Sequence, residues 1–366
     1  MTLSRRDFLK LMGGSALVSC TLNASVFNSS KPYIREAQYY NSLDNNMVEC
    51  ILCPNRCRLK EGGIGACGVR VNQNGQLQTL VYGRLCSLNN DPIEKKPLYH
   101  FMPGKNAISV ATPGCNLHCK FCQNWTISQA NPDEISTQYV SPNRLVATAN
   151  KYDSPIIAFT YSEPIIFYEY MYDVANQESD VKNVMISAGF IEEKPLKQLC
   201  EVLDGIKIDL KSFSNDFYRE LVSGRLEPVL KTLQTIKESG TWLEIVYLVI
   251  PTHNDDMDEI KEMCGWIVEN LGPEVPIHFT RFHPSYKMKN LPPTPLKTLD
   301  NAYEIAKQEG INYPYVGNVP QHKGENTYCP DCGSEVISRQ GFFIRNNKLE
   351  NGQCPECGHA IPGVWQ

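Results

Sequence analysis

From about residue 105 onward, short β-rich apolar runs alternate with helical stretches, and this rhythm constrains the fold more than any other feature of the chain. Alternating units of this kind form a parallel sheet covered by helices. The prediction is an α/β fold, a partial (β/α)6 TIM-like barrel over 105–318, with an open doubly wound sheet as the alternative. The β-rich runs lie at 107–111, 155–160, 181–187, 205–210, 241–250 and 275–280, with another near 311–316, and the helical stretches at 142–151, 164–175, 193–203, 227–239, 256–270 and 295–309.

Cysteines are concentrated in three short segments. The chain has 15 cysteines among 366 residues, and an odd number in a large chain makes a poor disulfide framework. Thiols two or three residues apart can converge on one ion or cluster. The sequence therefore predicts three metal sites, at Cys50, Cys53, Cys57 and Cys67, at Cys115, Cys119 and Cys122, and at Cys329, Cys332, Cys354 and Cys357.

The middle group has the spacing Cys-x3-Cys-x2-Cys and follows the first predicted barrel strand. The carboxyl end of a strand is where a β/α barrel places its active site. Three thiolates hold three corners of a four-iron cluster and leave one iron open to a ligand. Cys115, Cys119 and Cys122 therefore predict a reactive cluster rather than a closed structural site.

This loop carries the radical S-adenosylmethionine (SAM) signature, and the chain resembles that superfamily. Further blocks at 91–101, 122–125 and 361–365 resemble the radical enzyme of the AmmeMemoRadiSam system, which is similar to the pyruvate formate-lyase activating enzymes. The resemblance covers roughly 46–366. It implies a [4Fe-4S] cluster that cleaves SAM reductively to a 5′-deoxyadenosyl radical, which abstracts a hydrogen atom from a substrate.

The resemblance also implies cofactor-binding residues. Glu163 follows Tyr161-Ser162, where the family has two glycines, and corresponds to the residue that accepts hydrogen bonds from the methionine ammonium. Ser187 corresponds to a residue that reaches the ribose or the carboxylate. Phe121, beside the cluster, is a candidate to stack on the adenine, with plain packing as the alternative.

Two later strand ends complete the candidate site. Asp209 and Lys211 match the Asp-x-Lys pair of activating enzymes and are the candidate catalytic residues, with Lys211 facing the carboxylate of SAM. A simple surface ion pair is the alternative, and such a pair contributes little to stability. His283 matches a last-strand histidine near the ribose, and a structural histidine is the alternative.

The two flanking cysteine groups predict additional small modules. In the segment 322–366, two Cys-x-x-Cys-Gly knuckles are typical of a tetrahedral zinc ribbon, with a rubredoxin-like iron site as the second choice. In the Cys-rich segment 31–104, the four cysteines from Cys50 to Cys67 could hold zinc or a second iron–sulfur cluster, and their spacing leaves both open.

Residues 1–30 are interpreted as an export signal. Ser4-Arg5-Arg6 and a short apolar stretch resemble a twin-arginine signal, and Cys20 is a candidate for lipidation. The prediction is a periplasmic protein, or one held at the membrane only through a lipid anchor at Cys20. A cytoplasmic location is the alternative, because SAM is made inside the cell and the reactive cluster must stay strongly reduced.

Charge and resemblance together limit the partners. Lys and Arg number 35 against 40 Asp and Glu, and a net charge of −5 argues against a nucleic-acid partner. The leading function is radical modification of a protein, glycyl-radical activation being one form of it. The alternatives are radical chemistry on a small molecule or cofactor precursor, and a non-catalytic iron–sulfur or metal-binding protein. The resemblance implies Memo- and AMMECR-type companions, and the chemistry requires an electron donor of unknown identity.

Overall fold

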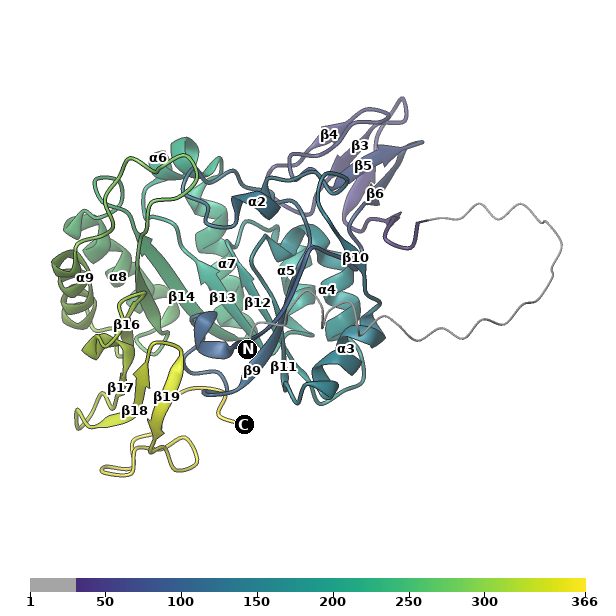
Figure 1. The fold of residues 1–366 in the computed structure, drawn as a ribbon. Helices are drawn as coiled ribbons and strands as arrows, with labels where there is room; N and C mark the ends of the chain where they lie inside the picture. The colour runs from purple at the N-terminus through teal and green to yellow at the C-terminus, as the bar shows by residue number, and fades with distance from the viewer. Residues whose placement is uncertain (1–30) are drawn as a thin grey trace.

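The computed structural model describes residues 31–366, so the predicted export signal and Cys20 lie outside the described residues. The core is an eight-stranded sheet in which the strands follow one another almost in chain order (Figure 1). Its parallel strands are β9 (Asn106–Ala111), β11 (Ile156–Phe159), β12 (Lys182–Ser187), β13 (Gly205–Asp209), β14 (Trp242–Val249), β15 (Ile277–Arg281) and β16 (Pro314–Gly317). Within the described chain, the two edge strands of this sheet do not pair, so it is an open, partial barrel.

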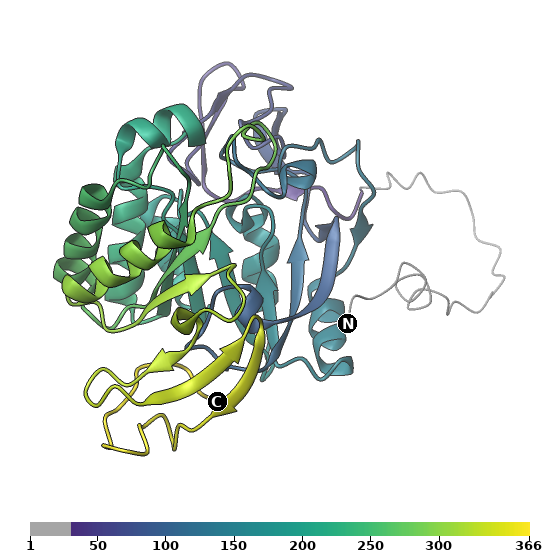
Figure 2. The ribbon, with the colours of Figure 1, turned by 60° about the vertical axis from the view of Figure 1, so that its left-hand side comes forward.

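Helices between the strands cover the outside of the sheet, as the α/β prediction requires (Figures 1 and 2). β11 is buried along its whole length, which explains its continuous apolar run. Pro142 occupies the first turn of its helix, and Gly240 ends another in the left-handed conformation. The longer helices are α3 (Pro142–Lys151), α4 (Tyr168–Ala175), α5 (Glu193–Cys200), α7 (Leu226–Ser239), α8 (Met257–Leu271) and α9 (Leu296–Gln308); the shorter ones are α2 (Trp125–Ser128), α6 (Asn215–Phe217), η1 (Ile93–Lys95), η2 (Pro164–Phe167), η3 (Tyr218–Val222) and η4 (Lys323–Glu325).

One strand of the core sheet has no counterpart in the sequence analysis. β8 (Ser87–Pro92) pairs antiparallel with β9 and forms the edge of the sheet opposite β16. Its sequence, SLNNDP, is polar and contains no apolar run, so periodicity gives no strand signal there. The edge pairing brings the segment that follows β8 into the core.

A Cys-rich N-terminal module lies beside α2, at the opposite end of the molecule from the C-terminal segment (Figures 1 and 2). It consists of two small three-stranded sheets, in the orders β1-β6-β5 and β2-β3-β4. Their strands are β1 (Arg35–Glu36), β2 (Tyr40–Ser42), β3 (Val48–Cys50), β4 (Arg58–Leu59), β5 (Arg70–Gln73) and β6 (Gln76–Thr79), and β7 (Arg84–Leu85) pairs with β10 (Gln138–Tyr139) nearby.

The C-terminal ribbon is a three-stranded sheet of β17 (Thr327–Tyr328), β18 (Glu335–Gln340) and β19 (Phe343–Asn347). The chain end anchors it to the core, because Met102 N–H donates to the carbonyl of Val364 at 2.6 Å. The segment between β8 and β9 is itself fixed to the sheet, since the backbone N–H groups of Tyr99 and His100 donate to the buried Glu244 carboxylate at 2.9 and 2.8 Å.

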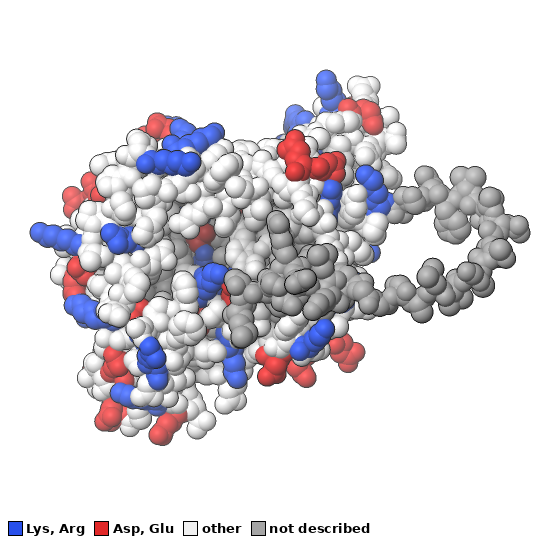
Figure 3. Space-filling model, in the orientation of Figure 1, with Lys and Arg blue, Asp and Glu red and all other residues white. Residues whose placement is uncertain are grey.

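Two surface properties complete the description. Among the described residues, every helix is too short or too polar to span a bilayer. Basic and acidic side chains are intermixed over the face shown in Figure 3, with neither sign forming a large field on the described part of that face.

Candidate active site

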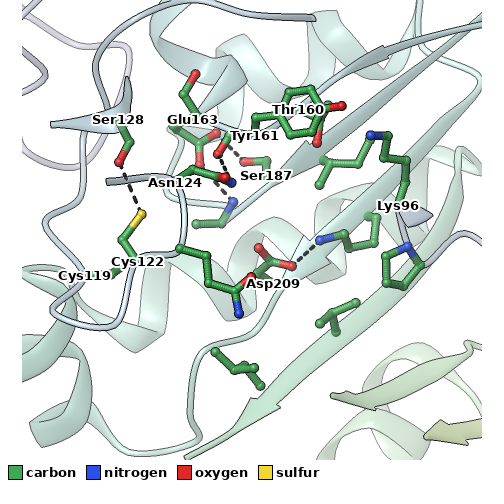
Figure 4. A pocket seen from close by; sticks show the side chains of 18 of the residues that line it. Lys96, Cys119, Cys122, Asn124, Ser128, Thr160, Tyr161, Glu163, Ser187 and Asp209 are labelled. Carbon is green, nitrogen blue, oxygen red and sulfur yellow. Dashed lines mark hydrogen bonds and ion pairs between the residues drawn. The ribbon is translucent and has the colours of Figure 1, made fainter. Parts of the chain in front are cut away.

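A cavity of about 430 Å³ lies inside the curve of the sheet, where the carboxyl ends of the first parallel strands meet (Figure 4). Its volume is within the range of small-molecule sites. The loop after β9 contributes the three cysteines, and β11, β12 and β13 contribute polar residues at or just beyond their ends. Of the predicted site residues, those that line the cavity are Cys115, Cys119, Phe121, Cys122, Glu163, Ser187, Asp209 and Lys211.

The three cysteines of the loop suit a cluster with one open iron. All three line the cavity, and no other cysteine of the described chain does. Leu117 N–H approaches the Cys115 sulfur at 3.4 Å, and the Ser128 hydroxyl lies 3.2 Å from the Cys122 sulfur. Three thiolates around a chamber with no fourth cysteine fit a [4Fe-4S] cluster whose remaining iron faces a ligand in the chamber.

Glu163 presents a buried carboxylate held by three donors. The Ser187 hydroxyl donates to Oε1 at 2.6 Å, Ala188 N–H donates to Oε2 at 2.9 Å, and Ile165 N–H reaches Oε1 at 3.2 Å. Burial raises the pKa of the Glu163 carboxyl, and these hydrogen bonds only partly oppose that effect. A cationic ligand would favour the ionised form of this carboxylate.

Asp209, the last residue of β13, is the half-buried centre of an ion cluster with Lys207 and Lys211. Its carboxylate contacts Lys207 on one oxygen and Lys211 on the other, at 2.9 Å for Lys211. Burial alone would raise the pKa of Asp209, but the two ammonium groups outweigh it and lower the pKa to about 2. Asp209 is therefore an anion that orients two lysines toward the cavity. The predicted Asp209–Lys211 contact is present, and it is not a surface pair.

A second charged group lies across the cavity. The Asp91 carboxylate binds Lys95 at 2.9 Å and Lys96 at 2.8 Å, and it accepts a hydrogen bond from the Tyr161 hydroxyl. Lys96 also lies 4.3 Å from the centre of the Tyr161 ring. Burial lowers the pKa of Lys96 to about 8, against the opposing attraction of Asp91. Tyr161, which replaces a family glycine, adopts a left-handed φ of +66° and thereby joins this group.

Phe121 and His283 lie in surroundings unlike those of the other predicted site residues. Phe121 is buried and packs on Phe217, with ring centres 5.7 Å apart, while one part of it lines the cavity. His283 is outside the cavity and lies exposed in an adjoining groove with Asn318 and Phe342. The chain leaves the sheet after Arg281, and Phe282 takes the buried position, so His283 faces outward.

The sequence analysis missed several cavity residues. Lys207 could have been found, because residues two apart on a strand share a face and Asp209 was already a candidate. Lys95 and Lys96 lie within the block 91–101 that resembles the AmmeMemoRadiSam enzyme, and the sequence predicts no individual role for either residue. Phe342, from the turn between β18 and β19, reaches the cavity from the ribbon, and no sequence signal placed it there.

The two flanking cysteine groups differ in geometry. In the ribbon, the sulfur atoms of Cys329, Cys332, Cys354 and Cys357 all lie within 4.8 Å of one another, and two of the pairs are 3.6 Å apart. A single tetrahedral ion with four thiolates needs sulfur atoms about 3.8 Å apart, so the ribbon cysteines fit one metal ion. The N-terminal cysteines, Cys50, Cys53, Cys57 and Cys67, line a separate narrow pocket.

Several known proteins are similar to this chain. Residues 109–264 match the radical SAM superfamily. A protein of Methanocaldococcus jannaschii described as uncharacterized is 47% identical over 318 residues, covering 86% of this chain and 94% of that protein. Among solved structures, a domain of a pyruvate-formate lyase-activating enzyme from Bacteroides vulgatus is 16% identical, with a TM-score of 0.40, over 44% of this chain and 98% of its own. A radical SAM methyltransferase from Sphaerobacter thermophilus is 15% identical, with a TM-score of 0.47, over 63% and 71%.

The resemblance to the AmmeMemoRadiSam enzyme stays a prediction, since none of these matches carries that description. The broader resemblance is confirmed by the superfamily match across the three-cysteine loop and the strands that line the cavity. Membership implies a [4Fe-4S] cluster and SAM as cofactors and supports an enzyme. The chain belongs to the radical SAM superfamily.

Proposed function

We propose that this protein cleaves SAM reductively and uses the resulting radical to take a hydrogen atom from a substrate. The observation that carries the proposal is the meeting of three cysteines, Glu163 and the Asp209–Lys211 pair around one cavity. When bound, the cluster supplies the electron that splits the sulfonium bond of SAM and gives the 5′-deoxyadenosyl radical. The protein supplies position and excludes water.

In this proposal, the polar residues hold the methionine part of SAM. Glu163 accepts hydrogen bonds from the ammonium group, which would meet a buried carboxylate. Lys211 faces the carboxylate of SAM, and Asp209 fixes the direction of its ammonium group. Ser187 both donates to Glu163 and lines the cavity, so it can reach the same end of the ligand. Phe121 supports the adenine side.

The proposed substrate is a protein segment that enters from the mouth of the cavity. A cavity of about 430 Å³ is near the lower end of the range for drug-sized ligands, so SAM would fill most of it. Phe342 lines the cavity from the ribbon, is 41% exposed and is followed by Phe343, which is 69% exposed. This exposed aromatic pair could contact a protein chain beside the cavity. Glycyl-radical activation is the form of this reaction that the resemblance suggests.

A small anionic molecule is the second candidate substrate, because one observation favours it. Lys95 and Lys96 line the cavity in addition to Lys207 and Lys211, whereas only Glu163 and Asp209 line it as acids. Asp91 pairs with both Lys95 and Lys96, so the four lysines exceed the three carboxylates Glu163, Asp209 and Asp91 by one positive charge. A carboxylate or phosphate of a small substrate would share Lys95 and Lys96 with Asp91.

The proposed location and partners of the protein come from its sequence. We propose twin-arginine export, with a possible lipid anchor at Cys20, and a strongly reducing one-electron donor. Memo- and AMMECR-type proteins remain proposed companions. The net charge of −5 is the reason for proposing a partner other than nucleic acid.

The decisive experiment is anaerobic assay of 5′-deoxyadenosine after loading the protein with iron and sulfide and adding dithionite and SAM. We expect product from the unaltered protein and none from Cys115→Ala. Cys200→Ala is the matched control, because Cys200 ends α5 and does not line the cavity. Absence of product from protein that contains a full cluster, with or without candidate substrates, would refute the proposal.

A further inference from the structure

The four N-terminal cysteines come from one strand end and two turns that fold into one place. Cys50 ends β3, Cys53 and Cys57 lie in the turn before β4, and Cys67 lies in the glycine-rich turn before β5. All four line the same pocket, whose other walls include Leu52, Ile165 and Ile166. Four thiols that converge on one narrow apolar pocket are a candidate metal site.

The separation of the sulfur atoms distinguishes a single ion from a cluster. A tetrahedral zinc ion needs its four sulfur atoms about 3.8 Å apart. Thiolates on different irons of a cube are much farther apart, because each binds its own corner. Among residues 31–366, the ribbon cysteines are the one group of His, Cys, Asp or Glu with three or more ligand atoms mutually within 4.8 Å.

The cluster-binding loop provides an internal comparison. Cys115, Cys119 and Cys122, whose superfamily holds a four-iron cluster, also lack the close spacing of a single-ion site. Among the N-terminal cysteines too, no three sulfur atoms lie within 4.8 Å of one another, although all four cysteines line one pocket. Their geometry therefore agrees with the iron–sulfur loop and differs from the ribbon.

A buried arginine with one unpaired N–H forms part of the pocket wall. Arg70 lines the same pocket and is only 2% exposed. Its Nη2 binds Glu169 at 2.6 Å and its Nη1 donates to the carbonyl of Gln38 at 3.0 Å, but its Nε has no hydrogen-bond partner among the described residues. A buried N–H without a partner costs free energy unless something accepts it. A sulfide or thiolate of a cluster in the pocket would be such an acceptor.

The N-terminal pocket adjoins the reactive site. Asn116, which follows Cys115, lines it, and the Asn55 side chain donates to the carbonyl of Asn116 at 2.8 Å. A Cβ added to Gly114 would lie 2.6 Å from the carbonyl oxygen of Cys67, so the two cysteine loops are in direct contact.

We propose that Cys50, Cys53, Cys57 and Cys67 hold a second [4Fe-4S] cluster directly behind the first. With four thiolate ligands it has no open iron, so it is suited to carry an electron rather than to bind a substrate. That suitability matters only if the proposed SAM cleavage is correct, whereas the presence of the cluster does not depend on it.

The test uses the full-length chain with the first cluster removed, as the variant Cys115→Ala/Cys119→Ala/Cys122→Ala. After anaerobic loading with iron and sulfide, we expect about four irons and four acid-labile sulfides per chain that the ribbon cannot explain, since a single-ion site contains no sulfide. Adding Cys53→Ala and Cys67→Ala should abolish the sulfide, whereas adding Cys200→Ala and Cys264→Ala should leave it unchanged. Circular dichroism and retention of the ribbon metal check that each variant is folded. Zinc without sulfide in the folded triple variant would overturn the proposal.

Electron paramagnetic resonance tests the placement of the second cluster. When both clusters of the unaltered protein are reduced with dithionite, their spins should couple. Its spectrum should therefore differ from the sum of the spectra of two single-cluster variants, the triple variant and a chain that carries only Cys53→Ala and Cys67→Ala. A spectrum equal to that sum would refute direct adjacency. Neither readout requires SAM cleavage, so failure of the proposed function and failure of this inference are distinguishable.

Discussion

Replacing Asp209 by Asn tests the ion cluster most directly, because the substitution removes the charge and keeps the shape. Asp209 binds Lys207, whose side chain is 5% exposed, and Lys211. The pKa of Asp209 is lowered from 3.8 to about 2, and a difference of about two pKa units corresponds to about 2–3 kcal/mol of stability at neutral pH. For a barrel of this size, that loss lowers Tm by about 5–10 °C.

The assay is thermal unfolding followed by far-UV circular dichroism on the anaerobically loaded protein. Because the folded pKa lies below the ordinary value, the stabilisation is complete above about pH 5 and disappears as the pH falls through about 2. The difference in Tm between the unaltered protein and Asp209→Asn should therefore stay constant from pH 8 to pH 5 and shrink at lower pH.

Two control variants distinguish the loss of the Asp209 ion pairs from a nonspecific destabilisation of the fold. Glu193→Gln breaks an exposed pair with Lys197, and we expect almost no change in Tm. Lys207→Gln/Asp209→Asn removes both charges of the most buried contact, and it should recover at least half of the Tm lost by the single variant, since only the less buried Lys211 ammonium is then left without its partner. An Asp209→Asn protein as stable as the unaltered chain, or a double variant no better than the single one, would refute the reasoning.

Four further outcomes follow from the structure. Glu163→Gln should raise KM for SAM about tenfold with unchanged iron content, because the carboxylate loses its charge while its neighbours remain (measured by 5′-deoxyadenosine formation at varied SAM). Cys332→Ala/Cys357→Ala should remove one metal ion and no sulfide in elemental analysis. Gly114→Ala should lower stability by more than 2 kcal/mol in urea unfolding, since its Cβ meets the Cys67 carbonyl, whereas Gly240→Ala, whose Cβ meets nothing within 4 Å, should cost about 1 kcal/mol. Activity should fall as the pH rises through about 8, where Lys96 loses its proton, and Lys96→Arg should extend the plateau to higher pH, so identical pH profiles would contradict a role for this charge.

The strands and helices of the barrel could be predicted because each leaves a local signal. Parallel strands buried on both faces read as short apolar runs, and helix ends show residues such as Pro142 and Gly240. β8 gave no such signal, because an edge strand with a polar sequence is held by its pairing with β9 rather than by its own apolar content. Local patterns therefore predict elements that bury apolar surface and miss elements defined by a neighbour.

The residues of the candidate site likewise divide into those that the sequence predicts and those that it does not. The three cysteines follow a spacing rule, and Glu163 and Asp209 are implied by the family resemblance, so all five are predicted from the sequence. The Asp91–Lys96–Tyr161 group joins residues 70 positions apart through an antiparallel edge and a left-handed backbone, and no local pattern contains that contact. The choice between zinc and a cluster in the N-terminal module likewise depends on the separation of sulfur atoms, which the number of intervening residues does not determine.

One segment connects the ribbon to the chemistry of the cavity. Between β8 and β9, Lys96 binds Asp91 at the cavity wall, and four residues later His100 lies fully buried, with its ring bonded to Tyr315 at 2.6 Å and to the carbonyl of Pro362 at 2.7 Å. The same stretch therefore fixes a lysine of the cavity and the position of the chain end. Because the ribbon reaches the cavity through Phe342, a metal ion held by the four ribbon cysteines would order the mouth of the cavity together with the ribbon. Such an ion would act through packing, since none of those cysteines lines the cavity.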